Sequence, residues 1–199
     1  MESLTSARTM GATLPEIIAR LRQDPGMVRQ FNDAYGHSPD ATSLVAALVT
    51  FERSLLTPGS RFDRWLGGDA SALTSQELGG YRLFKSLGCI ACHQGVNVGG
   101  NLFERRGIFK QLAAQSADTH DAFDNHEPTQ LLRVPSLRNV ATTAPYFHDG
   151  SAPTLADAVR RMSRSQLNSS LTDAQIDAIV AYLATLTGNY HGKPVGPPR

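Results

Sequence analysis

The two cysteines of this chain, Cys89 and Cys92, are followed directly by His93. A Cys-x-x-Cys-His pattern is the attachment motif of c-type haem. Two cysteines about one helical turn apart can each form a thioether with a vinyl carbon on the same edge of a porphyrin, and the next residue then presents its imidazole to the iron. Because the chain contains only 2 cysteines, this motif attaches one haem and cannot attach a second.

A redox-active cysteine pair and half of a zinc site are the alternatives for these thiols. A structural zinc site needs a second pair of ligands, and no further cysteine is present. A thioredoxin-like pair belongs in a strand–helix–strand setting. Here Thr74 and Glu77 form a capping box, and apolar residues follow at helical spacing up to Gly88, so a helix is predicted to deliver the motif. We therefore predict a c-type haem with His93 as an axial ligand.

The second axial position of the iron decides between electron transfer and direct chemistry on a small molecule. The candidate methionines beyond the initiator are Met10, Met27 and Met162, and the remaining histidines are His37, His120, His126, His148 and His191. Met162 lies on the apolar face of a helix predicted to begin after Thr154, and the polar residues that follow would let its sulfur lean toward a haem. A core methionine that fills a gap is the alternative that the residues alone leave open.

Charge and hydropathy exclude several classes of partner. Lys and Arg number 19 against 18 Asp and Glu, so a net charge of +1 gives no field for nucleic acid or an anionic membrane. No apolar run approaches the roughly 18 residues of a membrane span. The first residues also lack the basic and apolar blocks of a signal peptide. We expect a soluble chain with no nucleic-acid partner and no membrane span.

The apolar periodicity divides the chain into three parts. Residues 1–73 are predicted to be a helical platform, with helices over 14–22, 25–35 and 39–55. The loop that follows is unusually rich in charged and aromatic residues at 61–65 for a linker, and a helix-connecting corner plugged by Trp65 is the alternative. Residues 74–188 form the haem domain, whose last helix begins after Thr172. Residues 189–199 are predicted to be a tail that is poorly ordered or lies on a partner.

Between the motif and the later helices, residues 94–130 show little periodicity. They predict a long loop that wraps the haem, with a short helical piece near 107–116. Residues 131–139 form a tight apolar segment containing Arg133 and Arg138. These two arginines could neutralise haem propionates, and solvated surface arginines are the alternative.

Several segments together resemble the bacterial di-haem cytochrome c peroxidases, a family that includes enzymes maturing protein-derived quinone cofactors. The matching residues are Phe51–Leu55, Ser60–Leu66, Gly88–Gly100, Arg133–Val140, Ala144–Ser151 and Thr154–Met162. The resemblance extends from about Thr13 to Gly188. It implies an all-α fold, with a cytochrome c-like haem domain, an N-terminal helical extension and long loops around the haem.

The resemblance also implies site residues. Met162 corresponds to the distal ligand of the high-potential, electron-accepting haem, and because the quinone-maturing relatives use a tyrosine there, it favours the peroxidase branch. The backbone carbonyls of Thr143 and Pro145 correspond to calcium donors, although the sequence shows no acidic cage. Trp65 and His148 are candidates for the electron-transfer route or an interface.

One departure from the family pattern shapes the expected function. The second Cys-x-x-Cys-His of the family, in an N-terminal haem domain, is missing here. The resemblance therefore implies the electron-transfer half of a periplasmic cytochrome c peroxidase, an oxidoreductase that passes electrons to a peroxidatic haem for reduction of hydrogen peroxide to water. Implied partners are a small donor cytochrome c or copper protein, a second haem domain and a second copy of the chain. A stand-alone single-haem carrier or sensor without peroxidase activity is the alternative, and a module that never receives haem is a third reading.

Overall fold

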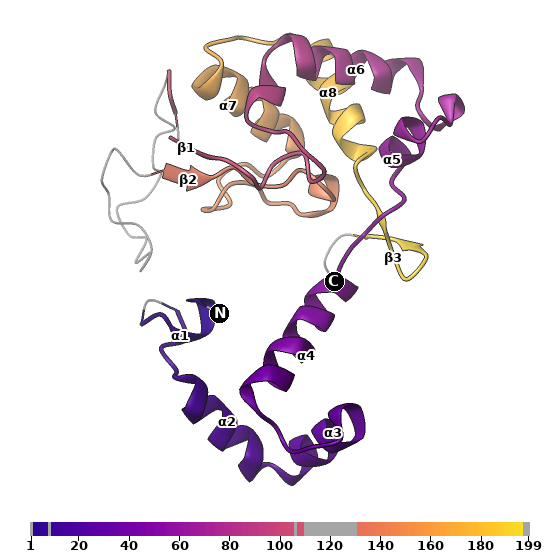
Figure 1. Ribbon diagram of the computed structural model, residues 1–199. Coiled ribbons are helices and arrows are strands. Elements are labelled where there is room, and N and C mark those ends of the chain that lie inside the picture. Colours follow the sequence, from indigo (N-terminus) through magenta and orange to yellow (C-terminus); the bar gives the residue numbers. More distant parts are fainter. Residues whose placement is uncertain (1, 8, 106, 110–130, 197–199) are drawn as a thin grey trace. The chain divides into compact units, whose positions relative to one another are not determined.

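The computed structural model describes residues 2–7, 9–105, 107–109 and 131–196 (Figure 1). These residues form two compact units that meet in the sequence between Leu56 and Thr57. The boundary predicted after residue 73 differs from this division, because residues 57–73 pack with the second unit. Among the helices described, none has the length and apolar character that a membrane crossing requires.

The first unit consists of helices α1 (Glu2–Thr5), α2 (Leu14–Gln23), α3 (Pro25–Tyr35) and α4 (Ala41–Ser54). The three predicted platform helices are thus confirmed to within a few residues. Their ends follow from local sequence: Thr13 caps α2 in a capping box with Glu16, and Asp24 caps α3. Gly36 then ends α3 in the left-handed conformation, at φ 77°.

The second unit is also mainly helical. Its longer elements are α5 (Arg61–Leu66), α6 (Ser75–Ser86), α7 (Leu155–Gln166) and α8 (Asp173–Ala184), with short 3₁₀ turns at Ala70–Ala72, Cys89–Ala91 and Val140–Thr142. The strands described form two antiparallel ribbons, β1 (Phe103–Arg105) with β2 (Leu131–Arg133) and β3 (Asn189–Tyr190) with β4 (Lys193–Pro194). The predicted all-α class is confirmed.

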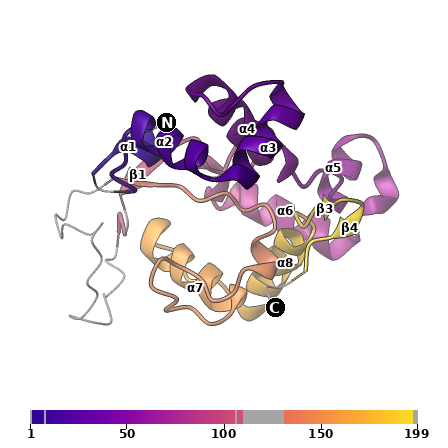
Figure 2. The same cartoon turned by 90° about the horizontal axis from the view of Figure 1, so that it is seen from below.

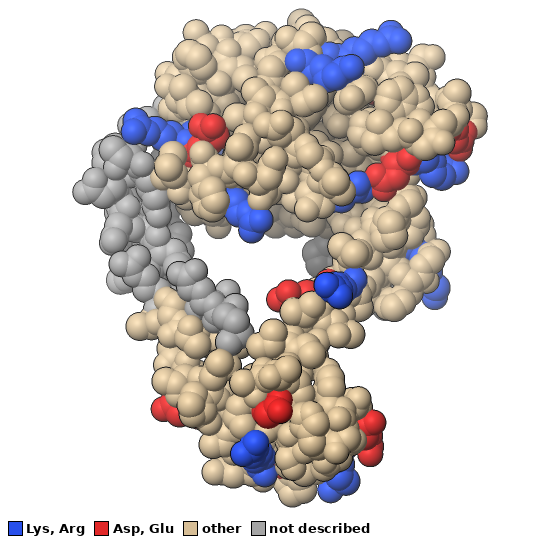
Figure 3. Space-filling model, in the orientation of Figure 1, with Lys and Arg blue, Asp and Glu red and all other residues tan. Residues whose placement is uncertain are grey.

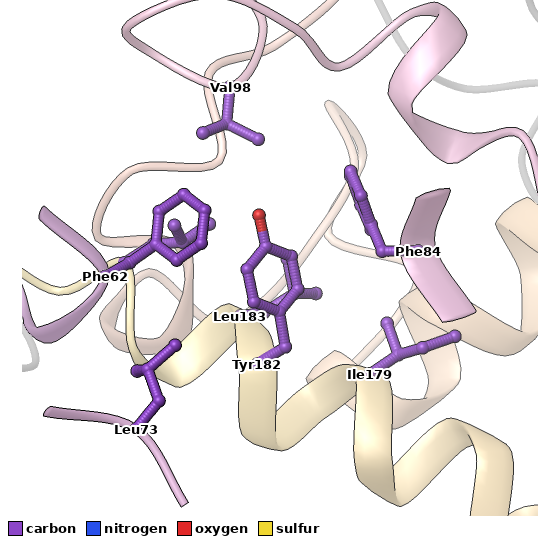
Figure 4. Close-up of a cluster of buried hydrophobic side chains, with 8 residues drawn as sticks. Phe62, Leu73, Phe84, Val98, Ile179, Tyr182 and Leu183 are labelled. Atoms are coloured by element: carbon purple, nitrogen blue, oxygen red, sulfur yellow. The ribbon is translucent and has the colours of Figure 1, made fainter. Parts of the chain in front are cut away.

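Helices α6 and α8 form the closest helix pair of this unit, and they lie side by side in both ribbon views (Figures 1 and 2). Gly80 permits the contact, because a Cβ at this position would overlap the backbone carbonyl of Ala178. Around the crossing, the buried core combines residues from α5, α6, α8 and the loops (Figure 4): Phe62, Leu73, Phe84, Val98, Ile179, Tyr182, Leu183 and Leu186. The core therefore joins segments that are far apart in the sequence.

Two segments differ from the sequence expectation. Residues 61–66 are a helix rather than a loop, because Ser60 and Asp63 form a capping box and the N–H of Phe62 bonds to the carbonyl of Thr185 at 3.1 Å. Residues 189–194 form the β3–β4 hairpin rather than a loose tail, and the N–H of Asn189 bonds to the carbonyl of Pro58 at 3.0 Å. Most of the helical piece expected near 107–116 lies outside the described residues.

Charged side chains of both signs are interspersed on the face of the molecule that Figure 3 shows, where neither sign forms one continuous field. This distribution agrees with the net charge of +1.

Candidate haem site

Helix α6 delivers the attachment motif. Thr74 caps the helix through the N–H of Glu77, and the Glu77 carboxylate accepts from the N–H of Thr74 at 2.7 Å. After α6, Gly88 turns the chain at φ 92°, a conformation that favours glycine. The N–H of His93 then bonds to the carbonyl of Cys89 at 3.0 Å, which closes one helical turn between the first cysteine and the histidine.

The two thiols have the wrong acidity for a redox-active pair. Burial raises the pKa of Cys89 to about 11, and burial followed by the nearby Glu104 carboxylate raises the pKa of Cys92. Reactive Cys-x-x-Cys motifs need the opposite, a lowered thiol pKa. In the part of the chain that the structure describes, no three His, Cys, Asp or Glu side chains gather into a metal site. The raised thiol pKa values argue against a reactive redox pair, and the described residues supply no third ligand for a zinc site.

His93 is held in a form that can ligate iron. Burial lowers its pKa, and the carbonyls of Val98 and Pro135 offset this in part, so the imidazole is neutral at pH 7. Its Nδ1 atom is buried and makes no hydrogen bond of ordinary geometry. Histidine ligands of metals commonly turn one ring nitrogen to the backbone. Nδ1 faces the loop backbone here, so Nε2 is the nitrogen that can face an iron.

Gly99 shapes the protein side of this imidazole. Its φ of 130° suits glycine, and a Cβ there would overlap the carbonyl of Pro135 and lie 3.3 Å from Nδ1 of His93. A hydrogen bond to a distant segment fixes the loop that carries Gly99: the N–H of Gly100 donates to the carbonyl of Val134 at 2.8 Å. The backbone therefore closes tightly behind the histidine.

Both arginines that are candidates for neutralising haem propionates have hydrogen-bond partners in the protein. Both terminal nitrogens of Arg138 bond to the carboxylate of Asp63, at 2.7 and 2.9 Å, and its Nε donates to the carbonyl of Val96 at 2.8 Å. The Nε of Arg133 donates to the carbonyl of Gly100 at 2.8 Å. Arg138 in particular is committed to holding the loop after the motif.

Met162 lies half-buried in α7, which Thr154 caps through the N–H of Asp157. It shares a helical face with Leu155 and Val159, which pack against the same core as Cys89. The residue after α7 approaches the motif itself, because a Cβ at Gly88 would lie 3.8 Å from Leu167. Met10 and Met27 belong to the first unit. Iron ligation by Met162 stays a prediction.

Trp65 belongs to a continuous series of aromatic rings. It is half-buried and stacks on Phe62, with 5.7 Å between ring centroids. Phe62 contacts Tyr182 at 5.3 Å, and Tyr182 contacts Phe84 at 5.2 Å (Figure 4). Phe84 in turn lies 6.3 Å from the imidazole of His93. Tyr182 is not among the predicted site residues, because its only signal in the sequence is an aromatic side chain on the apolar face of the last predicted helix.

The other predicted site residues lie on exposed turns. His148 is exposed in the turn that the pairing of Tyr146 with Ala152 closes. Thr143 and Pro145 are exposed as well. Calcium usually takes 6–8 oxygen ligands, and two carbonyls supply only a small part of that set. The calcium site therefore stays a prediction from the resemblance.

The fold of the second unit and the arrangement of Cys89, Cys92 and His93 define a c-type cytochrome domain. Residues 79–187 match the family model for cytochrome c, and residues 1–71 match the model for di-haem cytochrome c peroxidase. The chain therefore belongs to the di-haem cytochrome c peroxidase family, and its cytochrome c domain implies a c-type haem.

Curated relatives agree with this assignment. The chain is 45% identical over 148 residues to the cytochrome c551 peroxidase of Nitrosomonas europaea, a match covering 73% of this chain and 44% of that protein. It is 41% identical over 180 residues to the cytochrome c peroxidase of Escherichia coli, covering 88% and 39%. The chain thus spans about two fifths of the length of these relatives.

A solved structure supports the fold. The chain is similar to a MauG-like protein associated with microbial copper homeostasis, with a TM-score of 0.70 and 29% sequence identity. The similarity covers 94% of this chain and 67% of that chain.

Proposed function

We propose that this chain is the electron-transfer half of a cytochrome c peroxidase. It takes one electron at a time from a small cytochrome c or copper protein and passes it to a peroxidatic haem in a second haem domain. Two electrons and two protons there reduce hydrogen peroxide to two molecules of water. The observation that carries the proposal is the half-buried imidazole of His93, which follows Cys92 directly, bonds through its N–H to the carbonyl of Cys89 and has Nδ1 against the backbone of Gly99.

Each site residue has a defined task in this proposal. Cys89 and Cys92 would tether the haem, and His93 and Met162 would hold its iron. When bound, the haem supplies one-electron chemistry, and a thioether ligand favours its reduced state. Because both residues would occupy the iron, we expect this chain alone to be a poor peroxidase. Because c-type haem attachment in the family occurs outside the cytoplasmic membrane, we place the native protein in the periplasm.

Met162→Ala tests the axial ligand. We expect the oxidised parent protein to show the weak far-red charge-transfer band of a sulfur ligand on ferric haem, and the variant to lose it completely because alanine has no donor atom. Absorption spectroscopy of both proteins measures this. Met27→Ala is the matched control, since Met27 lies in α3 of the first unit and should leave the band unchanged.

Two outcomes would contradict this assignment. A band that survives in Met162→Ala assigns the sulfur to another methionine. A high-spin spectrum of the parent, together with peroxide turnover by this chain alone, favours a self-sufficient single-haem protein, a reading that the single attachment motif also permits.

The aromatic series suggests where electrons are taken up. We propose that a donor protein docks beside Trp65 and that the rings from Trp65 to Phe84 couple it to the ligand histidine. Successive rings lie 5.2 to 5.7 Å apart, in the range of direct aromatic contact. The series spans the core without interruption, whereas His148 lies on an exposed turn outside it.

Trp65→Leu should slow reduction of the haem by a reduced small copper protein several-fold, because it removes the outermost ring while keeping an apolar side chain. Stopped-flow absorbance at the haem bands measures the rate. Phe103→Leu on β1 removes an exposed aromatic residue outside the series and should leave the rate unchanged. Equal rates in the Trp65 variant and the parent would exclude this route.

A further inference from the structure

Asp63 and Arg138 form an ion pair beside the attachment motif. Two parallel hydrogen bonds of 2.7 and 2.9 Å join the guanidinium to the carboxylate. The side chains are only 19% and 25% exposed, for Arg138 and Asp63 respectively. Arg138 holds the pKa of Asp63 below its ordinary range, so the carboxylate is ionised at pH 7. Both members of the pair therefore carry full charge in a place that solvent screens poorly.

The pair is connected to the wall behind His93. The Nε of Arg138 donates to the carbonyl of Val96, three residues after the histidine. The hydroxyl of Ser136 donates to the carbonyl of Asn97 at 2.8 Å and fixes the same loop. This loop continues into Val98 and Gly99, whose backbone lies against Nδ1 of the imidazole.

The pair and the motif also border the same buried core. Phe62 directly precedes Asp63 in α5, and its ring contacts Tyr182 with 5.3 Å between ring centroids. Cys89 packs against the cluster that contains both rings. The ion pair and the first attachment cysteine therefore adjoin one cluster of buried side chains, where charges are screened less than in water.

We propose that the Asp63–Arg138 ion pair sets the reduction potential of the haem. The inference rests on the proposed haem site at Cys89, Cys92 and His93. Reduction lowers the charge on the iron by one, so an uncompensated cation nearby favours the ferrous state and an uncompensated anion favours the ferric state. As a pair, Asp63 and Arg138 compensate each other and hold the potential between these extremes.

Breaking the pair from its two ends separates electrostatics from packing. Asp63→Asn leaves Arg138 as an unpaired cation and should raise the midpoint potential. Arg138→Gln leaves Asp63 as an unpaired anion and should lower it. Potentiometric titration of the haem-loaded full chain measures both shifts, and the double variant should lie between the single ones. A merely structural pair would loosen the loop from either end and shift the potential in one direction only.

The Arg61–Glu77 ion pair is a matched control. It is bidentate as well, with both bonds at 2.6 Å, but its other partners are Ala72 and Thr74 rather than the loop after the motif. Glu77→Gln should lower the thermal stability and leave the potential unchanged. Arg138→Lys retains the positive charge but not the bidentate geometry, so its midpoint potential should stay near that of the parent. This variant tests the inference if Arg138→Gln does not fold.

The outcomes are distinct. Shifts of opposite sign in the two single variants support the inference. If the parent carries covalent haem and the two single variants shift the midpoint potential in the same direction, or not at all, this inference is overturned. The proposed haem site is then unaffected. A parent without covalent haem overturns both.

Discussion

Gly80→Ala is expected to destabilise the second unit by about 3 kcal/mol, the upper part of the usual range for overpacking. The added methyl group would overlap the carbonyl of Ala178, which is backbone and cannot rotate away, so α6 and α8 must separate. A gain of about 1 kcal/mol in helix propensity opposes the loss without cancelling it. Urea unfolding of the purified protein, followed by circular dichroism, measures the difference.

Gly79 is the matched control for this prediction. It precedes Gly80 in α6, but a Cβ there would meet no atom within 4 Å. Gly79→Ala should therefore stabilise the protein by roughly 0.5 to 1 kcal/mol through helix propensity alone. Equal effects of the two substitutions would show that the close helix crossing does not limit residue 80.

Replacing Cys89 and Cys92 together by serine is expected to abolish covalent haem attachment completely. Serine hydroxyls do not form the thioethers, and the chain contains no other cysteine. Haem staining after denaturing electrophoresis measures the loss. The unfolding temperature should fall as well, because a group bound only by the folded state stabilises that state.

His93→Ala separates tethering from ligation. This variant retains both cysteines, so its haem should remain covalently bound in the stained gel while its absorption spectrum loses the low-spin form. Covalent haem in the double serine variant would refute the assignment of the motif, and an unchanged spectrum in His93→Ala would refute the assignment of the ligand.

Local sequence signals predicted much of this protein. Capping boxes at Thr74 and Thr172 located α6 and α8, because such a box depends on residues three apart. The same signal is present at Ser60, but the surrounding glycines and proline predict a loop there. Cysteine counting predicted one tethered haem, and the family comparisons agree with a cytochrome c domain.

The sequence alone did not predict which distant residues individual side chains would contact. The sequence leaves Arg138 as a candidate for a haem propionate or a solvated surface residue, and only the folded chain brings it to Asp63, 75 positions earlier. The helix crossing at Gly80 likewise depends on Ala178, and the wall behind His93 depends on Pro135. A periodic pattern gives the face that a helix buries but not the segment that it meets.

The sequence by itself determined helices α2, α3, α4, α6, α7 and α8, the attachment motif and the limit of one haem from this motif, because each depends on residues a few positions apart. The tertiary structure decided the placement of α5 in the core, the neutral state and orientation of His93, and the pairing of Asp63 with Arg138. These features arise from burial and close backbone contact between distant segments. Their energies exist only once the core has formed, and so no local pattern encodes them.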